Sequence, residues 1–334
     1  MKQEVFMQTR KVALIGLGIM GYNHARILSN LDGVELVSVV DPIGDTRNQF
    51  PPEMVTRDIE SALELKPDYC VIAAPTAFHE EIAIRVIGQG ISFLIEKPIS
   101  IDLESARRIT DEANARGVVG AVGHIERFNA ALRQAREKIQ SGVLGEIYQV
   151  TTRRIGPFPS RISDVGVVMD LATHDIDLTS WLTGQKYESV AAQRVSRSGR
   201  SHEDLISVTG KLSGGIIVNH SVNWLSPLKE RKTIITGEKG TFVVDTLTTD
   251  LTFYANGTFE VAQDALAHFK GVTQGDIQIF AFPKPEPLLI EHKNFLEVVN
   301  GLHSEIVTLA EGTETVRVAQ AILESSTSQE TIKI

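Results

Sequence analysis

The sequence has little cysteine, no surplus of basic residues and no long apolar run. Its single cysteine, Cys70, cannot form an internal disulfide, which argues against a disulfide-stabilised scaffold. With 33 basic and 42 acidic residues, a formal charge of −9, the chain is not expected to bind nucleic acid or anionic membranes non-specifically. No stretch reaches the roughly 18 apolar residues of a membrane span, and residues 1–10 lack the apolar segment of a signal peptide. We therefore expect a cytoplasmic protein with no nucleic-acid or membrane partner.

What is present predicts two domains. A length of 334 residues is enough for two sizeable cores. After a flexible extension at residues 1–10, strand and helix patterns alternate over residues 11–125, which predicts an α/β Rossmann domain with a doubly wound parallel sheet. Over residues 126–334 strands follow one another with few helices, which predicts an α+β domain with a large, mostly antiparallel sheet. Several of these strands carry apolar residues on both faces, so we expect a homo-oligomer, a dimer or a tetramer.

A glycine-rich turn follows the first apolar strand and leads into a helix. Gly16 permits a tight turn, Gly18 lets the backbone approach a pyrophosphate, and Gly21 lets the helix pack closely on the strand. The helix opens at Ile19 and Met20, where free N–H groups and the positive end of the helix dipole favour phosphate. This pattern predicts a dinucleotide site.

Asp41 ends the second strand, about 20 residues beyond the last glycine, where a carboxylate accepts hydrogen bonds from a ribose diol. Pro42 follows, and no Arg or Lys stands beside it to bind a 2′-phosphate. The expected cofactor is therefore NAD rather than NADP. Two alternatives stay open: FAD, which uses a similar fingerprint, and glycines that serve only the turn.

Polar residues follow three later strands of the predicted sheet, at the edge where such sheets bind ligands. They are Pro75, Thr76 and His79 in the first turn, Glu96, Lys97 and Pro98 in the second, and Arg127 in the third. Lys97 is a candidate acid or base, because burial near a cationic nicotinamide would lower its pKa. The alternative is a solvated lysine in a loop.

A predicted helix at residues 169–182 places Asp170, His174 and Asp177 on one face. Such a set suits a general acid/base relay, a metal site or a simple surface pair. We expect no metal, because no cysteine or third ligand stands at a suitable spacing.

These motifs together resemble the glucose-fructose oxidoreductase and inositol dehydrogenase family, Gfo/Idh/MocA, over nearly the whole chain. The motifs are Gly16-x-Gly18-x-x-Gly21, Glu96-Lys97-Pro98 and Asp170-x-x-x-His174. The resemblance implies an NAD(P)-dependent oxidoreductase acting on CH–OH groups, in which His174 takes or relays the alcohol proton. It implies that Lys97 and Asp170 orient the substrate and tune the pKa of His174. The family's Pro-Thr-x-x-x-His stretch matches Pro75, Thr76 and, with one residue fewer between, His79.

Residues 123–129, 154–159 and 164–170 look most like the branch of UDP-N-acetylglucosamine 3-dehydrogenases. Many relatives have Gly-Gly-Gly before the catalytic helix, where this chain has Val165-Gly166-Val167. Arginine side chains suit a diphosphate, and the candidates for substrate binding are Arg127 and Arg154, with Arg153 and Arg161 as further choices, unless they are surface charges. The expected substrate is a sugar or nucleotide sugar, most simply a UDP-N-acetylhexosamine oxidised at its 3-hydroxyl. The alternatives are an inositol, polyol or free-sugar dehydrogenase or ketoreductase, and a non-catalytic NAD-binding regulatory protein.

Overall fold

The computed structural model describes residues 9–159, 165–257 and 273–334 and divides the chain into two compact units. Unit 1 runs to Ile125 and takes in Glu286–Gln320. Unit 2 comprises Glu126–Pro285 and Ala321–Ile334. The first boundary lies at the residue where the sequence pattern changes. Residues 286–320, expected in the second domain, belong to the first unit by their contacts.

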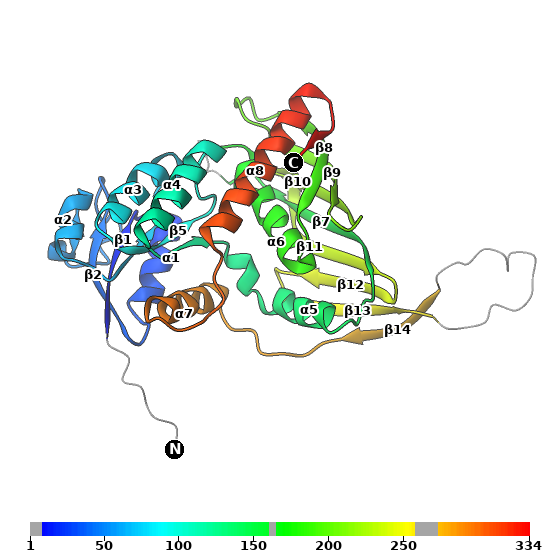
Figure 1. The fold of residues 1–334 in the computed structure, drawn as a ribbon, viewed down its shortest axis with the longest axis horizontal. Helices are drawn as coiled ribbons and strands as arrows, with labels where there is room; N and C mark the ends of the chain where they lie inside the picture. The colour runs from blue at the N-terminus through cyan, green and yellow to red at the C-terminus, as the bar shows by residue number, and fades with distance from the viewer. Residues whose placement is uncertain (1–8, 160–164, 258–272) are drawn as a thin grey trace, which may run out of the picture. The chain divides into compact units, whose positions relative to one another are not determined.

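Unit 1 contains a six-stranded parallel sheet in the order β3-β2-β1-β4-β5-β6 (Figure 1). This is the order of a doubly wound dinucleotide-binding fold, as predicted. The elements are β1 (Arg10–Ile15), α1 (Ile19–Leu28), β2 (Val34–Val40), η1 (Pro52–Met54), β3 (Val55–Thr56), α2 (Ile59–Glu64), β4 (Tyr69–Ile72), η2 (Thr76–Phe78), α3 (His79–Gly88), β5 (Ser92–Glu96), α4 (Leu103–Arg116), β6 (Gly120–Gly123), α7 (Pro287–Val299) and α8 (Leu309–Ser328), whose last residues belong to unit 2; η3 (Ile125–Phe128) crosses the boundary.

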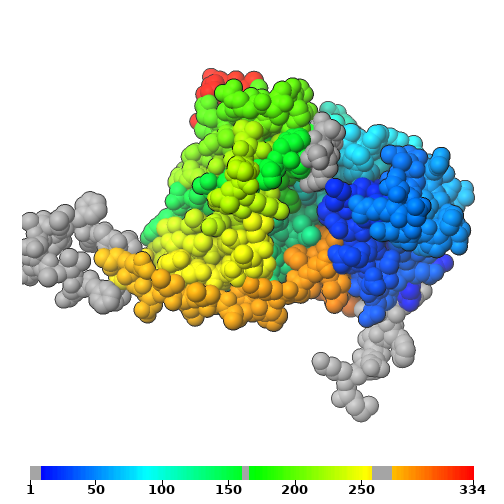
Figure 2. Space-filling view, turned by 180° about the vertical axis from the view of Figure 1, so that it is seen from behind, coloured from blue at the N-terminus to red at the C-terminus, as the bar shows by residue number. Residues whose placement is uncertain are grey.

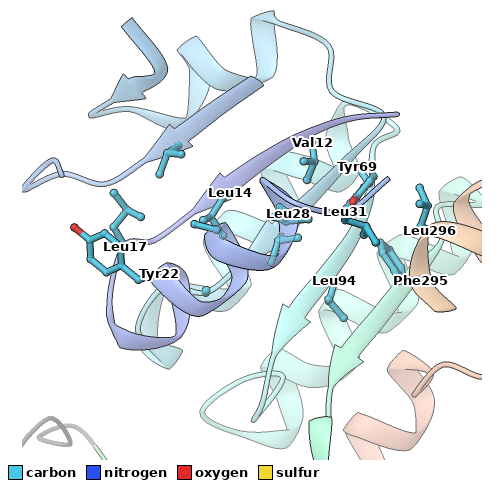
Figure 3. Packing of buried hydrophobic residues seen from close by; sticks show 14 of the residues in the cluster. Val12, Leu14, Leu17, Tyr22, Leu28, Leu31, Tyr69, Leu94, Phe295 and Leu296 are labelled. Atoms are coloured by element: carbon cyan, nitrogen blue, oxygen red, sulfur yellow. The ribbon is translucent and has the colours of Figure 1, made fainter. Parts of the chain in front are cut away.

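Helix α7 belongs to unit 1 because its apolar side chains complete the core of that unit. Phe295 and Leu296 are buried in the same cluster as Leu14 and Leu94 of the sheet (Figure 3). The ring of Phe295 meets that of Tyr69 edge to face, with 5.5 Å between the ring centroids. The helix lies in the first core although its residues were expected in the second domain, since a sequence pattern does not say which core a helix faces.

Unit 2 contains a nine-stranded sheet in the order β14-β13-β12-β11-β7-β10-β9-β8-β15, antiparallel except for the β7–β10 pair. The predicted α+β class is therefore confirmed. The elements are α5 (Ala130–Gln140), β7 (Ile147–Pro157), η4 (Val168–Ala172), α6 (Thr173–Thr183), β8 (Tyr187–Val195), β9 (Leu205–Leu212), β10 (Ile217–Asn223), β11 (Leu225–Gly237), β12 (Gly240–Asp245), β13 (Asp250–Asn256), β14 (Gln274–Ile279) and β15 (Ile332–Lys333).

Helices α5 and α6 contact one face of this sheet. The green and yellow strands of the other face form a broad surface in the view from behind (Figure 2). The pairing register and the alternation of side chains along a strand put a set of apolar residues on that second face. They are Ile217, Ile234, Val243, Tyr254, Ile277 and Ile279.

Three local predictions for unit 2 differ from the structure. The helix expected from residue 169 opens with a π-helical segment, η4. The dipeptide Asn256-Gly257 is typical of a two-residue hairpin turn, but β13 ends at Asn256 and its partner β14 begins only at Gln274. Strands β14 and β15 were missed because both lie at sheet edges, where short strands carry a weak alternating pattern. In the described part of the chain, every helix is too short or too polar to cross a membrane.

Candidate functional site

The glycine turn of unit 1 is shaped by three positions that lack a Cβ. Gly16 has φ +101°, and a Cβ there would lie 2.6 Å from the Ala73 carbonyl oxygen of β4's turn. A Cβ on Gly21 would lie 2.0 Å from the Gly16 carbonyl oxygen. At Gly18, which precedes Ile19 at the start of α1, a Cβ would meet nothing within 4 Å. Gly18 is therefore free of packing demands and leaves open space at a helix N-terminus, which fits a pyrophosphate.

Asp41 fastens the end of β2 to this turn. One carboxylate oxygen accepts the Leu17 N–H at 2.8 Å, and the other accepts the Ile43 N–H at 2.9 Å. Each oxygen keeps a further lone pair for a ribose hydroxyl, because an ionised carboxylate has about four acceptor positions. The half-buried Met20 and the exposed Ile19 follow in the first turn of α1.

Pro75 and Thr76 lie at the turn after β4, at the same edge of the sheet. His79 is buried, and both of its ring nitrogens face main-chain oxygens, Nδ1 that of Pro98 at 3.0 Å and Nε2 that of Ala74 at 2.9 Å. Burial lowers the pKa of His79. The imidazole therefore joins two loops of the cofactor edge instead of presenting a ring nitrogen to a ligand.

The turn after β5 presents Lys97 half-buried beside the buried Glu96. One oxygen of Glu96 accepts the Lys97 main-chain N–H at 3.1 Å. Burial works to raise the pKa of the Glu96 carboxyl, but a hydrogen bond and the charge of His24, followed by the charge of Lys97, hold it below its ordinary value. Lys97 thus stands at the ligand edge of the sheet with a fixed main chain.

Unit 2 carries the second set of predicted residues on η4 and α6. Asp170 lies in the π-helical segment and His174 in the first turn of α6, and both are buried. Single π-helical turns occur frequently at functional sites, because they change the direction of side chains along a helix. A buried carboxylate and imidazole on successive turns suit acid/base work.

Glu203 fixes the start of this helix. Its carboxylate accepts the Val168 N–H at 2.9 Å, and its main-chain oxygen accepts the Val167 N–H at 3.0 Å. A Cβ at Gly166 would lie 2.1 Å from a carboxylate oxygen of Glu203. A larger residue at Gly166 would therefore push the Glu203 carboxylate away from the Val168 N–H.

Arg127 and Arg154, the predicted substrate arginines, are both buried and paired with carboxylates. Arg127 binds Asp177 through two hydrogen bonds, of 2.8 and 2.5 Å. Arg154 donates to Glu126 at 2.8 Å and to Asp175 at 3.1 Å. Both guanidinium groups therefore bind carboxylates in the interior. Neither arginine is the solvated surface charge of the alternative interpretation. Of the two further choices, Arg153 is exposed and pairs with Glu230, and Arg161 lies outside the described residues.

Arg154 and the charged residues around it shift one another's pKa values. Burial favours a higher pKa for Glu126, but the charge of Arg154 holds the Glu126 pKa below its ordinary value. At Asp175 burial outweighs the attraction of Arg154, so its pKa is raised. Burial and the neighbouring charge of Arg154 lower the pKa of Arg231. Asp175, Glu126 and Arg231 were missed from the sequence, because their partner lies on another element.

Comparison with known proteins agrees with this geometry. One model of the oxidoreductase family, its NAD-binding Rossmann fold, matches residues 10–124, and another, its C-terminal alpha/beta domain, matches residues 136–334. The chain belongs to the Gfo/Idh/MocA oxidoreductase family. The predicted family is confirmed, and the glycine turn belongs to an NAD-binding domain.

Two curated relatives and one solved structure illustrate the similarity. UDP-N-acetylglucosamine 3-dehydrogenase of Acidithiobacillus ferrooxidans is 30% identical over 249 residues, 74% of this chain and 77% of that protein. scyllo-Inositol 2-dehydrogenase (NAD(+)) of Bacillus subtilis is 29% identical over 191 residues, 54% of this chain and only 56% of that relative's length. A solved structure of the Acidithiobacillus protein has a TM-score of 0.81 at 24% identity, covering 96% of this chain and 98% of that one. The structural likeness supports the shared fold.

Proposed function

We propose that this protein is an NAD-dependent sugar dehydrogenase that oxidises a secondary ring hydroxyl to a ketone, with the 3-hydroxyl of a UDP-N-acetylhexosamine as the first choice of substrate. The observation that carries the proposal is that one chain contains both an NAD-binding glycine turn and a buried Asp170 and His174 on a π-to-α helix. The 30% identity to a UDP-N-acetylglucosamine 3-dehydrogenase supports the choice of substrate.

The residues of this chain have distinct roles in the proposed reaction. His174 accepts the proton of the substrate hydroxyl as the carbon–oxygen double bond forms. Lys97 and Asp170 hold the reacting hydroxyl and tune the pKa of His174. NAD, held by the glycine turn and Asp41, would supply the hydride acceptor for the same carbon. The sum is one alcohol and NAD⁺ converted into one ketone, NADH and a proton.

Gly16, Gly18 and Gly21 hold the pyrophosphate in this proposal, with Ile19 and Met20 at the helix start. Asp41 binds the ribose of the adenosine. Pro75, Thr76, Glu96 and Lys97 line the nicotinamide side of the sheet edge. His79 supports that edge through its two main-chain contacts.

An inositol or free-sugar dehydrogenase is the second candidate, and one observation favours it. The two arginines expected to bind a diphosphate, Arg127 and Arg154, are already paired with buried carboxylates. Similarity to an inositol dehydrogenase supports the same choice. Under this candidate the catalytic residues keep their roles and no affinity for UDP is expected.

Thermal unfolding in the presence of NADH separates these candidates. UDP, UDP-N-acetylglucosamine, N-acetylglucosamine and myo-inositol are added in turn, because a ligand at 100 times its Kd stabilises the native state by about 2.7 kcal/mol. We expect both UDP ligands to raise the midpoint. A shift with inositol or the free sugar alone would replace the first candidate by the second.

Turnover of the responding ligand, followed by NADH absorbance, tests the catalytic roles. Lys97→Ala is expected to lower kcat at least about 100-fold, the contribution of a positioned acid or base. The control is Lys211→Ala, since Lys211 is exposed and pairs with Glu188. Equal turnover in the two variants would remove Lys97 from the mechanism. If wild type binds NADH yet turns over no sugar or polyol of the panel, the non-catalytic regulatory alternative is favoured.

We further propose that the protein is a homo-oligomer that uses the second face of the unit 2 sheet. That face carries Ile277 and Ile279, both exposed, beside the ring of Tyr254 on the neighbouring strand. Light scattering of wild type and of Ile277→Lys measures the mass in solution. A multiple of 36.6 kDa that falls on substitution supports the proposal, and a wild-type monomer refutes it.

A further inference from the structure

Four titratable side chains of unit 1 lie together away from solvent and have no part in the reaction proposed above, apart from Glu96 beside Lys97. His24 extends from α1, Glu96 ends β5, and Glu291 and His292 come from α7. Their exposed fractions are 0%, 7%, 2% and 1%. Lys, Glu and His side chains are seldom buried to this extent unless they pair with one another.

Three of these groups and a main-chain N–H form a continuous chain of hydrogen bonds. His292 Nε2 lies 2.8 Å from His24 Nδ1, and His24 Nε2 lies 2.8 Å from Glu96 Oε1. Glu96 Oε2 accepts the Lys97 N–H at 3.1 Å. An ionised Glu96 requires His24 to donate from Nε2 in either protonation state of the ring; a protonated His24 also donates from Nδ1 to His292, and a neutral one accepts there. The chain therefore runs from α7 through α1 to the turn that presents Lys97.

The charges of the cluster follow from burial. Burial, and then the charge of Glu96, raise the pKa of Glu291 well above its ordinary value, which favours its uncharged form. Burial and the charge of His24 lower the pKa of His292 well below its ordinary value, so His292 is uncharged as well. Glu96 alone remains a carboxylate, because the His24 hydrogen bond opposes the effect of burial. The groups that face Glu96 are His24 from α1, Glu291 and His292 from α7, His79 from α3, and the adjacent Lys97.

We propose that His24 is a positioning residue for the Lys97 turn, because it keeps Glu96 a carboxylate in the place where that carboxylate accepts the Lys97 main-chain N–H. His292 fixes the orientation and tautomer of His24, so α7 supports the active site through this chain. The inference rests on the proposed role of Lys97 and adds two histidines that no motif of the site contains.

The pH dependence of kcat tests the proposal. In wild type the hydrogen bond and charge of His24 hold the pKa of Glu96 below its ordinary value, whereas His24→Leu leaves Glu96 buried without its donor and therefore protonated at a higher pH. The acid limb of the kcat profile should move up by about one pH unit, the size expected for a lost hydrogen bond to a charged group. His24→Gln keeps a donor near the position of Nε2 and should restore most of the profile.

The matched control is His220→Leu. His220 is another buried imidazole with two partners, Thr152 Oγ1 at 2.7 Å and Tyr187 Oη at 2.8 Å, and lies in unit 2. Its loss should reduce stability and leave the acid limb of the kcat profile in place. If His24→Leu behaves like this control, His24 has a purely structural role and the proposal is wrong. Should His24→Leu fail to fold, His292→Leu breaks the same chain one step further from Glu96, and its acid limb is expected to move in the same direction.

An infrared measurement separates failure of this proposal from failure of the proposed function. At a pH between the acid limbs of the two kcat profiles, the difference spectrum of His24→Leu against wild type should contain the carbonyl band of a protonated carboxylic acid. The band should disappear in His24→Leu/Glu96→Gln. Presence of the band supports the charge assigned to Glu96, whatever the turnover of Lys97→Ala. Normal turnover of Lys97→Ala would refute only the proposed role of Lys97. Absence of the band overturns the proposal.

Discussion

The cofactor turn of unit 1 and the catalytic helix of unit 2 depend on different kinds of chemical groups. In unit 1 the cofactor turn consists of backbone, with Gly16, Gly18 and Gly21 placed where a Cβ would collide or fill open space. In unit 2 the helix with Asp170 and His174 is flanked by buried ion pairs of Arg127 and Arg154. A backbone site tolerates changes in the side chains around it, whereas a buried ion pair leaves an uncompensated charge as soon as one partner is lost.

The largest effect is expected from breaking the Arg127–Asp177 pair. Arg127→Met should lower the free energy of unfolding by about 3–5 kcal/mol, because Asp177 is left buried and charged. Urea denaturation measures the change. The double variant Arg127→Met/Asp177→Leu should recover most of the loss, since an apolar pair of similar volume replaces the ions.

Arg153→Met is the matched control for that comparison. Arg153 has a side chain that is 57% exposed and pairs with Glu230, so its removal should cost less than about 1 kcal/mol. If Arg127→Met instead raised KM without loss of stability, Arg127 would be a substrate residue as first expected.

The second prediction concerns a polar group in the core of unit 2. Burial lowers the pKa of His220 to about 4 from an ordinary value of 6.5, so the folded state resists a proton that the unfolded chain takes up. The contribution of neutral His220 to the free energy of unfolding is therefore fully present above pH 6.5. It is lost as the pH falls towards 4, by up to about 3 kcal/mol. Unfolding free energies of wild type and His220→Gln, measured across this range, should converge as the pH falls. A constant difference between them would contradict the assigned pKa.

The difference between a backbone site and buried side-chain pairs also explains which features could be predicted from the sequence. The cofactor turn, the Glu96-Lys97-Pro98 turn and the doubly wound class of the first sheet could be predicted from local patterns, because such features require particular residues or periodicities at short spacings. The Asp102 cap of α4 is another local feature, and its carboxylate accepts the Ser105 N–H at 2.7 Å.

Pairs of distant residues could not be predicted in this way. His24 and His292 meet across 268 positions of sequence, and Arg127 and Asp177 across 50. A single sequence contains each residue but no signal that joins the two. The π-helical segment was missed for a related reason, since the start of that helix is set by Glu203, a residue of another segment.

The third prediction uses Glu203 and Gly166 to test how tightly the catalytic helix is held. Gly166→Ala should push the Glu203 carboxylate away from the Val168 N–H and lower the unfolding free energy by about 2 kcal/mol, the value of a hydrogen bond to a charged group. Calorimetry measures the loss. In a Glu203→Ala background, Gly166→Ala should lower the unfolding free energy much less.

The control for that substitution is Gly88→Ala. A Cβ at Gly88, at the end of α3, would meet nothing within 4 Å, so this alanine should stabilise by up to about 1 kcal/mol. Additive losses for Gly166→Ala and Glu203→Ala would show that the two residues do not interact.

The smallest effect is expected in unit 1, at the side chain proposed to bind the adenosine ribose. Asp41 accepts the Leu17 and Ile43 N–H groups and is proposed to bind the adenosine ribose. Asp41→Ala should reduce the preference for NAD over NADP about tenfold, because the charge that repels a 2′-phosphate and the ribose acceptor are lost together. Ratios of kcat/KM for the two cofactors give the preference, with Asp58→Ala as control because Asp58 also accepts a main-chain N–H, that of Ser61, at the start of α2. Asp41→Asn keeps one acceptor oxygen but loses the charge, so its ratio of kcat/KM values separates the contribution of hydrogen bonding from that of charge repulsion. An unchanged ratio in Asp41→Ala would mean that the backbone turn alone selects the cofactor.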